Sequence, residues 1–369
     1  MRICIVTNRT ENVRWFREDL VALLAKRGHD VLVLGDEESA KWDCYFANLG
    51  ARYLAYPIRR SGLNPIEEVS ALNYLTHVFQ HEKPDKVFTY QAKANVYGCL
   101  AASRAGVPEI YASVEGLGTL ADEIGLKRKV VNLILRMLYK PALSAAIKVF
   151  FINPDDVAFF LSHKLVDKDK VVMTNGVGVN LGKFAFTPIP EGKPLFLFMG
   201  RLVKAKGIRE FVNAARMMIA DGVDAEFHIL GDFDTSLDAI SEQELCSWVD
   251  EGCVVYDGAV DDVRPFLQKC TALVSPSHRE GVPKSAMESM AVGRPIVASD
   301  ITGFRIVVEN GKTGILVSLG STELLASGMR ELVSQPGMAK VMGEAARRKA
   351  EKEFDVGYVN ETICSTMGV

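Results

Sequence analysis

Short apolar runs alternate with helical segments along this chain, and this rhythm limits the possible folds more than any other feature. The runs are RICIVT, DVLVLG, RYLAYPI, KVFTY and EIYASV, followed later by LFLFMG, AEFHILG, CVVYDG, TALVSPS and RPIVASD. Strands that lack polar alternation are buried on both faces of a sheet, and helices between them favour parallel pairing. The pattern therefore predicts parallel α/β sheets covered by helices on both faces.

A stretch rich in glycine and proline, NGVGVNLGKFAFTPIPEGKP, divides the strand–helix rhythm into two halves. At 369 residues the chain is also longer than one ordinary hydrophobic core supports. We expect two tandem, doubly wound Rossmann-like domains, at residues 1–180 and 190–345, whose strand ends face each other across a cleft. The helical segment 346–369 is expected to return and pack on the first domain.

Composition excludes several classes of function. The net charge of −3 leaves no excess of cations to neutralise a nucleic-acid backbone, so we expect no nucleic-acid partner. The seven cysteines form no C-x-x-C pair and no zinc-ligand spacing with the six histidines, which favours a reducing cytosol. The start of the chain lacks the apolar segment of a signal peptide, and no run reaches the ~18 apolar residues of a membrane span. We expect a cytoplasmic protein.

Two cations in FLFMGRLVKAKG stand where a strand gives way to a helix. Arg201 follows the strand directly, and Lys206 precedes the helix that begins after Gly207. An arginine can bind a phosphate with two parallel hydrogen bonds while a lysine acts as a point charge, so the pair could hold a diphosphate. The alternative is two solvated cations on a loop.

The segment SPSHREGVPKSAMESM carries two glutamates eight positions apart. Glu280 falls in a loop and Glu288 within the following helix, whose first turn suits Pro283. The free N–H groups of Lys284 and Ser285 at the helix start form a natural anion site. Carboxylates accept hydrogen bonds from hydroxyls, so one glutamate could hold a ribose and the other a sugar. Alternatively, Glu280 is a solvated loop residue and Glu288 an acid favoured by the helix dipole.

The order GRLVKAKG then EGVPKSAME resembles the retaining nucleotide-sugar glycosyltransferases of family 4, which have the GT-B fold and a Glu-x7-Glu motif. The likeness extends to GRPIVASDITGFRIVVENGKTGILV and GVGVNLGKF. It implies that Arg201 and Lys206 bind the donor diphosphate, and that these two residues and Glu280 are the catalytic set. It implies that Glu288 holds the ribose and Glu280 contacts the transferred sugar. The residues expected to line the sugar and phosphates are Gly281, Val282, Pro283, Lys284 and Ser285.

The first half resembles one branch of this family. YPIRRSGLNP, TYQAKANVYG, VEGLGTLAD and FINPDDVAFF are similar to enzymes that elongate polyprenyl-diphosphate-linked glycans, including N-acetylgalactosaminyl- and galactosyltransferases. Many family members have a histidine near the end of the EIYASV strand, where this chain has Glu115. The resemblance leaves as candidates for acceptor binding Arg59, Lys93, Glu115 and Gly116.

Residues 126–154 contain six Lys/Arg residues and no acid. At helical spacing, Leu126, Val130, Leu133, Met137 and Leu138 share one stripe, and Arg128, Asn132, Arg136 and Lys140 share another face. A basic amphipathic helix is attracted to an anionic membrane surface, although a solvated face of an ordinary helix is the alternative. The candidate membrane contacts are Lys127, Arg128, Lys129, Arg136 and Lys140.

Two further motifs are rejected as cofactor sites. GLGTLA at residues 116–121 matches a dinucleotide-binding pattern, but it follows a late strand and lacks the acidic residue expected about 20 positions later. DFD at residues 232–234 matches the D-x-D pattern that binds a metal in another glycosyltransferase fold. Because cations already serve the diphosphate, we expect no metal and no cofactor.

The sequence thus predicts a retaining transfer of a hexose or N-acetylhexosamine from a UDP-sugar to a polyprenyl-diphosphate-linked saccharide. Such an enzyme would build bacterial surface polysaccharide or glycoprotein glycans, in peripheral contact with the cytoplasmic face of the membrane. Three alternatives remain open: a nucleotide-sugar epimerase of related fold, a non-enzymatic two-lobed sugar-binding protein, and a retaining glycoside hydrolase. The last would need two carboxylates about 5 Å apart and would leave the phosphate-like features unexplained.

Overall fold

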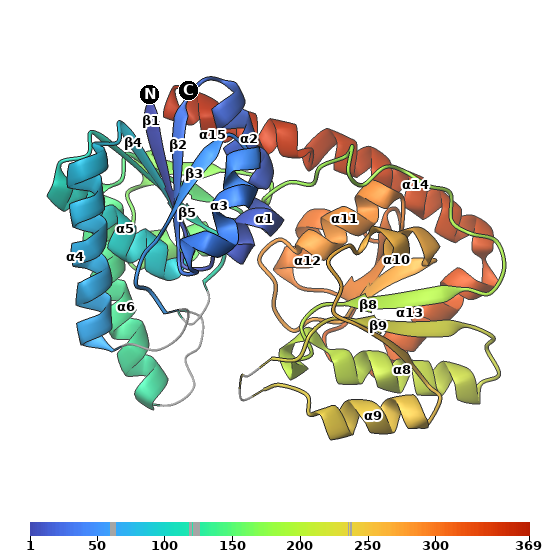
Figure 1. Ribbon diagram of the computed structural model, residues 1–369. Coiled ribbons are helices and arrows are strands. Elements are labelled where there is room, and N and C mark those ends of the chain that lie inside the picture. The colour runs from blue at the N-terminus through green and yellow to red at the C-terminus, as the bar shows by residue number, and fades with distance from the viewer. Residues whose placement is uncertain (60–63, 118–119, 121–125, 235, 237) are drawn as a thin grey trace. The chain divides into compact units, whose positions relative to one another are not determined.

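The computed structural model describes residues 1–59, 64–117, 120, 126–234, 236 and 238–369 (Figure 1). The chain forms two compact units. The first unit combines Met1–Val177 with Gly357–Val369, and the second is Gly178–Val356.

The first unit contains, in its described part, a seven-stranded sheet whose strands all pair in parallel. Its order is β3-β2-β1-β4-β5-β6-β7. The order reverses beside β1, as in a doubly wound sheet, so the predicted architecture is confirmed for this unit. The strands are β1 (Arg2–Val6), β2 (Asp30–Gly35), β3 (Ala51–Ala55), β4 (Lys86–Tyr90), β5 (Glu109–Val114), β6 (Lys148–Phe151) and β7 (Val171–Met173).

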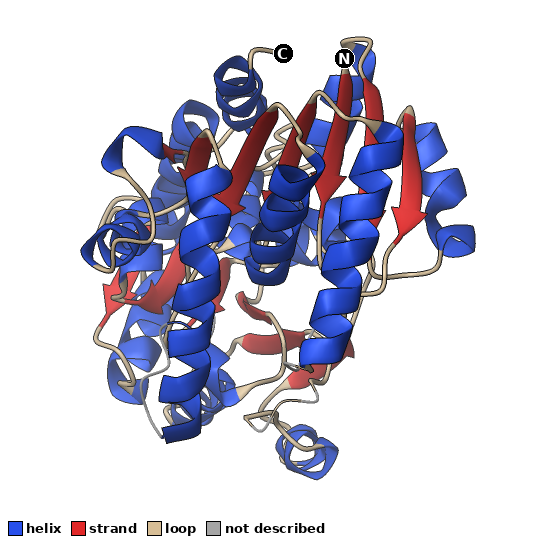
Figure 2. Ribbon diagram, turned by 90° about the vertical axis from the view of Figure 1, so that its left-hand side faces the viewer, coloured by secondary structure: helices blue, strands red, loops and turns tan. Residues whose placement is uncertain are grey.

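Helices cover both faces of this sheet. On one face α5 packs between α4 and α6, which Figure 2 shows as neighbouring parallel rods. Val6, Phe79 and Val87 belong to the core beneath them, whereas Ile5, Phe46 and Phe150 belong to the core on the opposite face. The helices are α1 (Glu11–Phe16), α2 (Glu18–Lys26), α3 (Ser39–Asn48), α4 (Pro65–Glu82), α5 (Ala92–Ala105), α6 (Leu126–Ala145), α7 (Pro154–Ser162) and α15 (Val356–Met367).

The second unit is also doubly wound, with described strands in the order β10-β9-β8-β11-β12-β13, all parallel. Its strands are β8 (Leu195–Met199), β9 (Glu226–Leu230), β10 (Val255–Gly258), β11 (Ala272–Ser275), β12 (Ile296–Ser299) and β13 (Gly314–Val317). Its helices are α8 (Ile208–Ala220), α9 (Glu242–Asp250), α10 (Arg264–Lys269), α11 (Lys284–Val292), α12 (Thr302–Val307), α13 (Thr322–Ser334) and α14 (Pro336–Glu353). The second predicted sheet is therefore confirmed as well.

The C-terminal segment divides between the two units. Ala339 and Met342 of α14 are buried in the core of the second unit. Helix α14 ends at Glu353, and Ile363 and Cys364 of α15 are buried in the core of the first unit. Of the segment 346–369 that we expected on the first domain, only Gly357–Val369 lies there.

Three strands are missing from the sequence prediction, and one predicted helix is broken. β6 follows α6 after only two residues, so its apolar KVFF run merges with an apolar helix in the sequence. β7 has three residues, and β13 lies within a loop-like glycine-rich stretch. The helical spacing of ENVRWFREDLVALLAKRGH after the first strand predicts one helix, but α1 ends at Phe16 and α2 begins at Glu18, because Arg17 leaves helical geometry with a φ of −136°.

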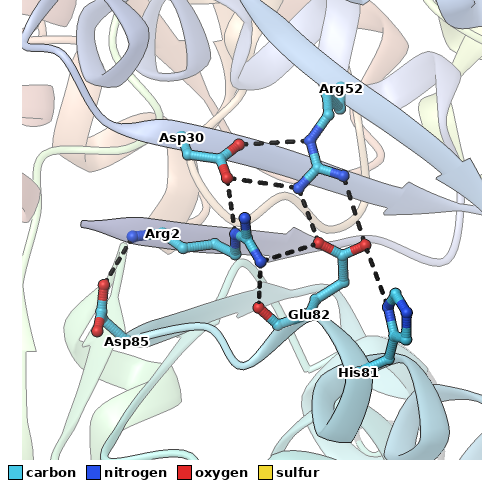
Figure 3. A network of polar contacts seen from close by, with 6 residues as sticks. All are labelled: Arg2, Asp30, Arg52, His81, Glu82 and Asp85. Atoms are coloured by element: carbon cyan, nitrogen blue, oxygen red, sulfur yellow. Dashed lines mark hydrogen bonds and ion pairs between the residues drawn. The ribbon is translucent and has the colours of Figure 1, made fainter.

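Where the first sheet begins, arginines and acids form a closed ionic network (Figure 3). Arg2 Nε lies 2.6 Å from Asp30 Oδ2, and Arg52 Nη2 lies 2.8 Å from Glu82 Oε2. Each arginine also contacts the other acid, at 3.3 Å. Hydrogen bonding from Arg52 holds the pKa of Glu82 below its usual value. Each arginine contacts both acids and each acid contacts both arginines, and His81 Nδ1 lies 3.8 Å from Glu82 Oε1.

Candidate active site

Three loops of the second unit meet where β8, β9 and β11 end. These strands are neighbours in the sheet, with β8 in the middle, so their carboxyl ends lie at one edge. A Cβ atom added to Gly231 would collide with the carbonyl oxygen of Gly200, and one on Gly207 with that of Pro276. Gly207 also has a φ of +72°. Glycine is therefore required at both positions for the loops to pack this closely.

Lys206 and Glu280 meet at this edge. The Nζ atom of Lys206 lies 2.5 Å from Glu280 Oε1, and the two side chains are 26% and 13% exposed. Lys206 ends a short 3-10 turn, Lys204–Lys206, and Glu280 lies in the loop between β11 and α11. Two residues that are 74 positions apart in the sequence are thus brought into direct contact.

Arg201 pairs with a different acid. Its Nη1 atom lies 2.6 Å from Asp234 Oδ2, while its side chain remains 52% exposed. Burial opposes ionisation of Asp234, but hydrogen bonds from Ser236 and Arg201 outweigh it and lower the pKa to about 2. The second acid of the D-x-D motif is therefore ionised and holds an arginine. Sequence reasoning rejected the motif as a metal site and did not foresee this pair.

Helix α11 begins after the loop that carries Glu280. Pro283 stands just before the helix, and Ala286 N donates the first backbone bond back to Pro283 O. The N–H groups of Lys284 and Ser285 precede that bond, which is the arrangement of a helix anion site. Gly281 packs on α12, because a Cβ on Gly303 would lie 2.6 Å from its carbonyl oxygen. Val282 is buried.

Glu288 lies one turn into α11 and is only 6% exposed. Burial raises its pKa above the usual glutamate value, although the nearby Lys284 acts in the opposite direction. Lys284 donates a hydrogen bond to Glu288 Oε1, a contact that their i,i+4 spacing could have predicted. Glu280 and Glu288 thus have separate lysine partners, which fits two separate parts of one ligand better than an acid–base couple.

In the first unit, Glu115 follows β5 and pairs with Arg17, a residue that the sequence analysis missed. Arg17 is 2% exposed, donates to Glu115 Oε1, and has its guanidinium 5.7 Å from the ring centroids of Phe88 and Tyr90. The arginine stands at the break between α1 and α2. A continuous amphipathic pattern hides such a break, and only the charged residue within the stripe could have signalled it.

Two further acceptor candidates, Lys93 and Arg59, form a second group. Lys93 Nζ lies 2.5 Å from Glu68 Oε1 and 2.8 Å from the backbone oxygen of Arg59. Arg59 in turn pairs with Glu67 at 3.3 Å, and its side chain is 76% exposed. Gly116 has a φ of +141°, which suits a glycine directly after Glu115. The structure brings Lys93 to Arg59 and Glu115 to Arg17.

The outer face of α6 differs from the basic face that we predicted. Asn132 is buried, because it faces the core, and the guanidinium of Arg136 lies 5.2 Å from the Phe159 ring centroid. Lys129 and Lys140 are exposed, whereas the side chains of Lys127 and Arg128 lie outside the described part of the structure. The exposed row is apolar: Val130 (50%), Leu133 (60%), Ile134 (43%) and Met137 (67%).

The two rejected motifs have different outcomes. Three of the six GLGTLA residues, 118, 119 and 121, lie outside the described residues, and D-x-D is occupied by contacts within the protein. Within the described ranges no group of three or more His, Cys, Asp or Glu side chains could hold a metal ion. In the same ranges, every helix is too short or too polar to cross a membrane.

Comparison with known proteins matches both units to glycosyltransferase models. Residues 13–176 match the "Glycosyl transferase 4-like domain" and residues 193–335 match "Glycosyl transferases group 1". The chain is 30% identical to the N,N'-diacetylbacillosaminyl-diphospho-undecaprenol alpha-1,3-N-acetylgalactosaminyltransferase of Campylobacter jejuni, over 85% of each chain. It is 24% identical to the UDP-Gal:alpha-D-GlcNAc-diphosphoundecaprenol alpha-1,3-galactosyltransferase of Escherichia coli, over 90% of this chain and 87% of that protein.

Solved structures share the fold. Sucrose-phosphate synthase of Thermosynechococcus elongatus superposes with a TM-score of 0.80 at 18% identity, covering 100% of this chain and 98% of that one. Anabaena HepE, solved in complex with UDP, gives a TM-score of 0.78 at 16% identity and full coverage of both chains. With both sheets doubly wound and both halves matched, the chain belongs to the group 1, family-4-like glycosyltransferases of the GT-B fold.

Proposed function

We propose that this protein transfers a hexose or N-acetylhexosamine from a UDP-sugar to a polyprenyl-diphosphate-linked saccharide, with retention at the anomeric carbon. The observation that supports this most strongly is Lys206, which contacts Glu280 in the loop that leads into α11 and lies against Gly200, the residue next to Arg201. The Campylobacter and Escherichia relatives are transferases whose names specify undecaprenol-diphosphate-linked acceptors. The reaction would belong to assembly of a bacterial surface polysaccharide or glycoprotein glycan.

In this proposal the cations act on the leaving group. The bond between the anomeric carbon and the β-phosphate oxygen breaks, and negative charge develops on UDP. Arg201, Lys206 and the N–H groups at Lys284 and Ser285 stabilise that charge, since fixed donors cost no reorganisation during the reaction. The acceptor oxygen forms the new bond on the same face of the sugar, and its proton passes to the departing β-phosphate oxygen.

The two glutamates would hold opposite ends of the donor. Glu288 accepts hydrogen bonds from the ribose hydroxyls, and its burial suits a fixed part of the ligand. Glu280 positions the transferred sugar once the diphosphate takes Lys206 from it. The remaining donor contacts come from Gly281, Val282 and Pro283, whose loop leads into the helix. UDP as the nucleotide is supported by the fold shared with HepE, which was solved with UDP.

The acceptor would bind the first unit. The Glu115 carboxylate can accept hydrogen bonds from saccharide hydroxyls, and buried Arg17 holds it in place. Gly116 lets the backbone turn directly behind it. Lys93 and Arg59 supply positive charge, which suits the diphosphate of a lipid-linked acceptor.

Peripheral contact with the cytoplasmic membrane face is a further part of the proposal. The exposed apolar row of α6, flanked by Lys129 and Lys140, fits a shallow insertion into an anionic lipid surface. Sedimentation with phosphatidylglycerol-containing vesicles should fall for Leu133→Glu. Val341→Glu, at an equally exposed valine on α14, is the matched control. Equal sedimentation of both variants would remove α6 from the proposal.

We also propose that transfer requires no metal ion, because protein cations already surround the expected diphosphate position. Activity should then persist after treatment with EDTA. A complete loss of activity that is restored by Mg²⁺ would contradict this point.

A donor screen tests the function itself. The purified protein is incubated with radiolabelled UDP-sugars and a lipid extract of bacterial membranes, and label is measured in the organic phase. Transfer from one UDP-sugar is the expected result, and turnover of GDP-sugars alone would overturn the base assignment. Conversion of a UDP-sugar without acceptor would indicate an epimerase. Free-sugar release without nucleotide would indicate a hydrolase, and binding without turnover would indicate a sugar-binding protein.

A further inference from the structure

Asp234, the second acid of the D-x-D motif, contacts Arg201 of the proposed diphosphate site. Its Oδ2 atom lies 2.6 Å from Arg201 Nη1, and its side chain is 10% exposed. Its other oxygen, Oδ1, accepts the backbone N–H of Ser236 at 2.8 Å. One carboxylate oxygen is thus fixed by its own loop, and the other faces the arginine.

The loop that carries Asp234 is tied to the loop that carries Arg201. Leu202 N donates to Asp232 O at 3.0 Å, Ile240 N donates to Leu202 O at 2.9 Å, and Lys204 N donates to Asp238 O at 2.8 Å. These bonds enclose Asp234 on both sides. The acid therefore belongs to the same backbone frame as Arg201, rather than meeting it through two long, independent side chains.

Glu280 and Asp234 differ in what they can do once a donor binds. Glu280 leaves Lys206 and has a sugar to hold. Asp234 is anchored by Ser236 and carries a full negative charge beside the place proposed for another anion. A diphosphate that approaches Arg201 must take the arginine from Asp234 and then tolerate that carboxylate nearby.

We propose that Asp234 is a competing counter-ion that weakens nucleotide binding at Arg201 and speeds release of UDP after transfer. This inference rests on the proposed role of Arg201 in binding the diphosphate. Asp234 acts through Arg201 and is a positioning residue. In the free protein Asp234 forms an ion pair with Arg201. After transfer the same ion pair forms again as UDP leaves.

The test is calorimetric titration of UDP into four proteins: wild type, Asp234→Asn, Arg201→Ala and the double variant. Asparagine keeps the shape and the bond to Ser236 but removes the charge. Since Arg201 is half exposed, we expect Asp234→Asn to lower the Kd for UDP about threefold to tenfold. Asp221→Asn is the matched control, because Asp221 forms an exposed pair with Arg330 at the C-terminus of α8.

The result expected is tighter UDP binding in Asp234→Asn, a lower kcat where UDP release limits turnover, and no gain in the Arg201→Ala background. An unchanged or higher Kd in Asp234→Asn, with Arg201→Ala still weakened, would overturn the counter-ion role and leave the proposed function standing. A gain that persists without Arg201 would also overturn it. If wild type fails to bind UDP, both this inference and the proposed donor are wrong.

Discussion

Two sets of ion pairs in this protein contain the same types of residue but differ in how many acids each cation contacts. In the network of Figure 3, Arg2 and Arg52 each contact both Asp30 and Glu82. Where the second sheet ends, Arg201, Lys206 and Lys284 each contact one acid among the described residues: Asp234, Glu280 and Glu288 respectively.

The number of partners separates the two sets. A ligand entering the network of Figure 3 would have to replace several contacts at once, so that network fits a structural role. At the second site one phosphate can replace one carboxylate at each cation. Geometry supports the same division, because Arg201–Asp234 and Lys206–Glu280 lie on loops at the carboxyl ends of parallel strands, where α/β proteins bind ligands. Lys284 and Glu288 lie in the first turns of α11, directly after one of these loops.

Lys206→Ala should produce the largest effect. Loss of one fixed charge that stabilises a leaving group lowers kcat by about a hundredfold to a thousandfold. Initial rates of sugar transfer measure the effect, and circular dichroism checks that the variant is folded. Lys312→Ala is the control, since Lys312 is an exposed lysine of the same unit that pairs with Glu309. Comparable rates for both variants would show that Lys206 does not stabilise the leaving group.

Glu115→Gln should raise the KM for the acceptor about tenfold while leaving the KM for the donor unchanged, because a hydrogen bond to a charged group is lost. Steady-state kinetics with each substrate varied in turn separate the two constants. A change confined to the KM for the donor would contradict this, because it would place Glu115 in the donor site.

Glu288→Gln should weaken the donor yet stabilise the fold at neutral pH. The pKa of Glu288 is raised by burial, so its proton is held more tightly in the folded than in the unfolded state. Its contribution to stability is full below the unfolded pKa and is lost as pH rises through the folded pKa. The variant should therefore melt roughly 2–4 °C above wild type near pH 8, and the difference should vanish near pH 4. A difference in melting temperature that grows as the pH falls would contradict the raised pKa of Glu288.

Arg52→Met should leave transfer unchanged and cost about 1 kcal/mol of unfolding free energy, the scale of an exposed ion-pair network. Because the pKa of Glu82 is lowered, its contribution is present above its unfolded pKa and lost as pH falls through the folded value. Urea unfolding at neutral and acidic pH measures both. Reduced transfer by a fully folded Arg52→Met would show that the two sets are less separate than proposed.

Both sheets could be predicted from the sequence, because the hydrophobic periodicity and composition of each segment determine whether it forms a strand or a helix. The sequence also placed Arg201 directly after a strand, Lys206 before a helix, Glu280 in a loop and Glu288 within the following helix. Pairing across long sequence distance was beyond it: Asp234 reaches Arg201 only because β8 and β9 are neighbours in the sheet. Arg17 was hidden because a one-residue break in a helix leaves the amphipathic pattern almost intact.

The outer face of α6 shows a different limit. The sequence shows the period of the stripe but not which of two faces meets the core. The buried Asn132 and the stacking of Arg136 on Phe159 turn the helix so that an apolar row is exposed. The orientation of α6 depends on its packing against α5, so it cannot be predicted from the residues of α6 alone.

The central claim is that a nucleotide diphosphate binds the single cation–acid pairs of the second unit and not the closed network of the first. Titration of UDP into wild type, Lys206→Ala and Arg52→Met, under identical salt and pH, tests it directly. We expect a Kd that is at least about tenfold higher for Lys206→Ala and unchanged for Arg52→Met. Wild-type affinity in Lys206→Ala, or a loss of binding in a folded Arg52→Met, would contradict it.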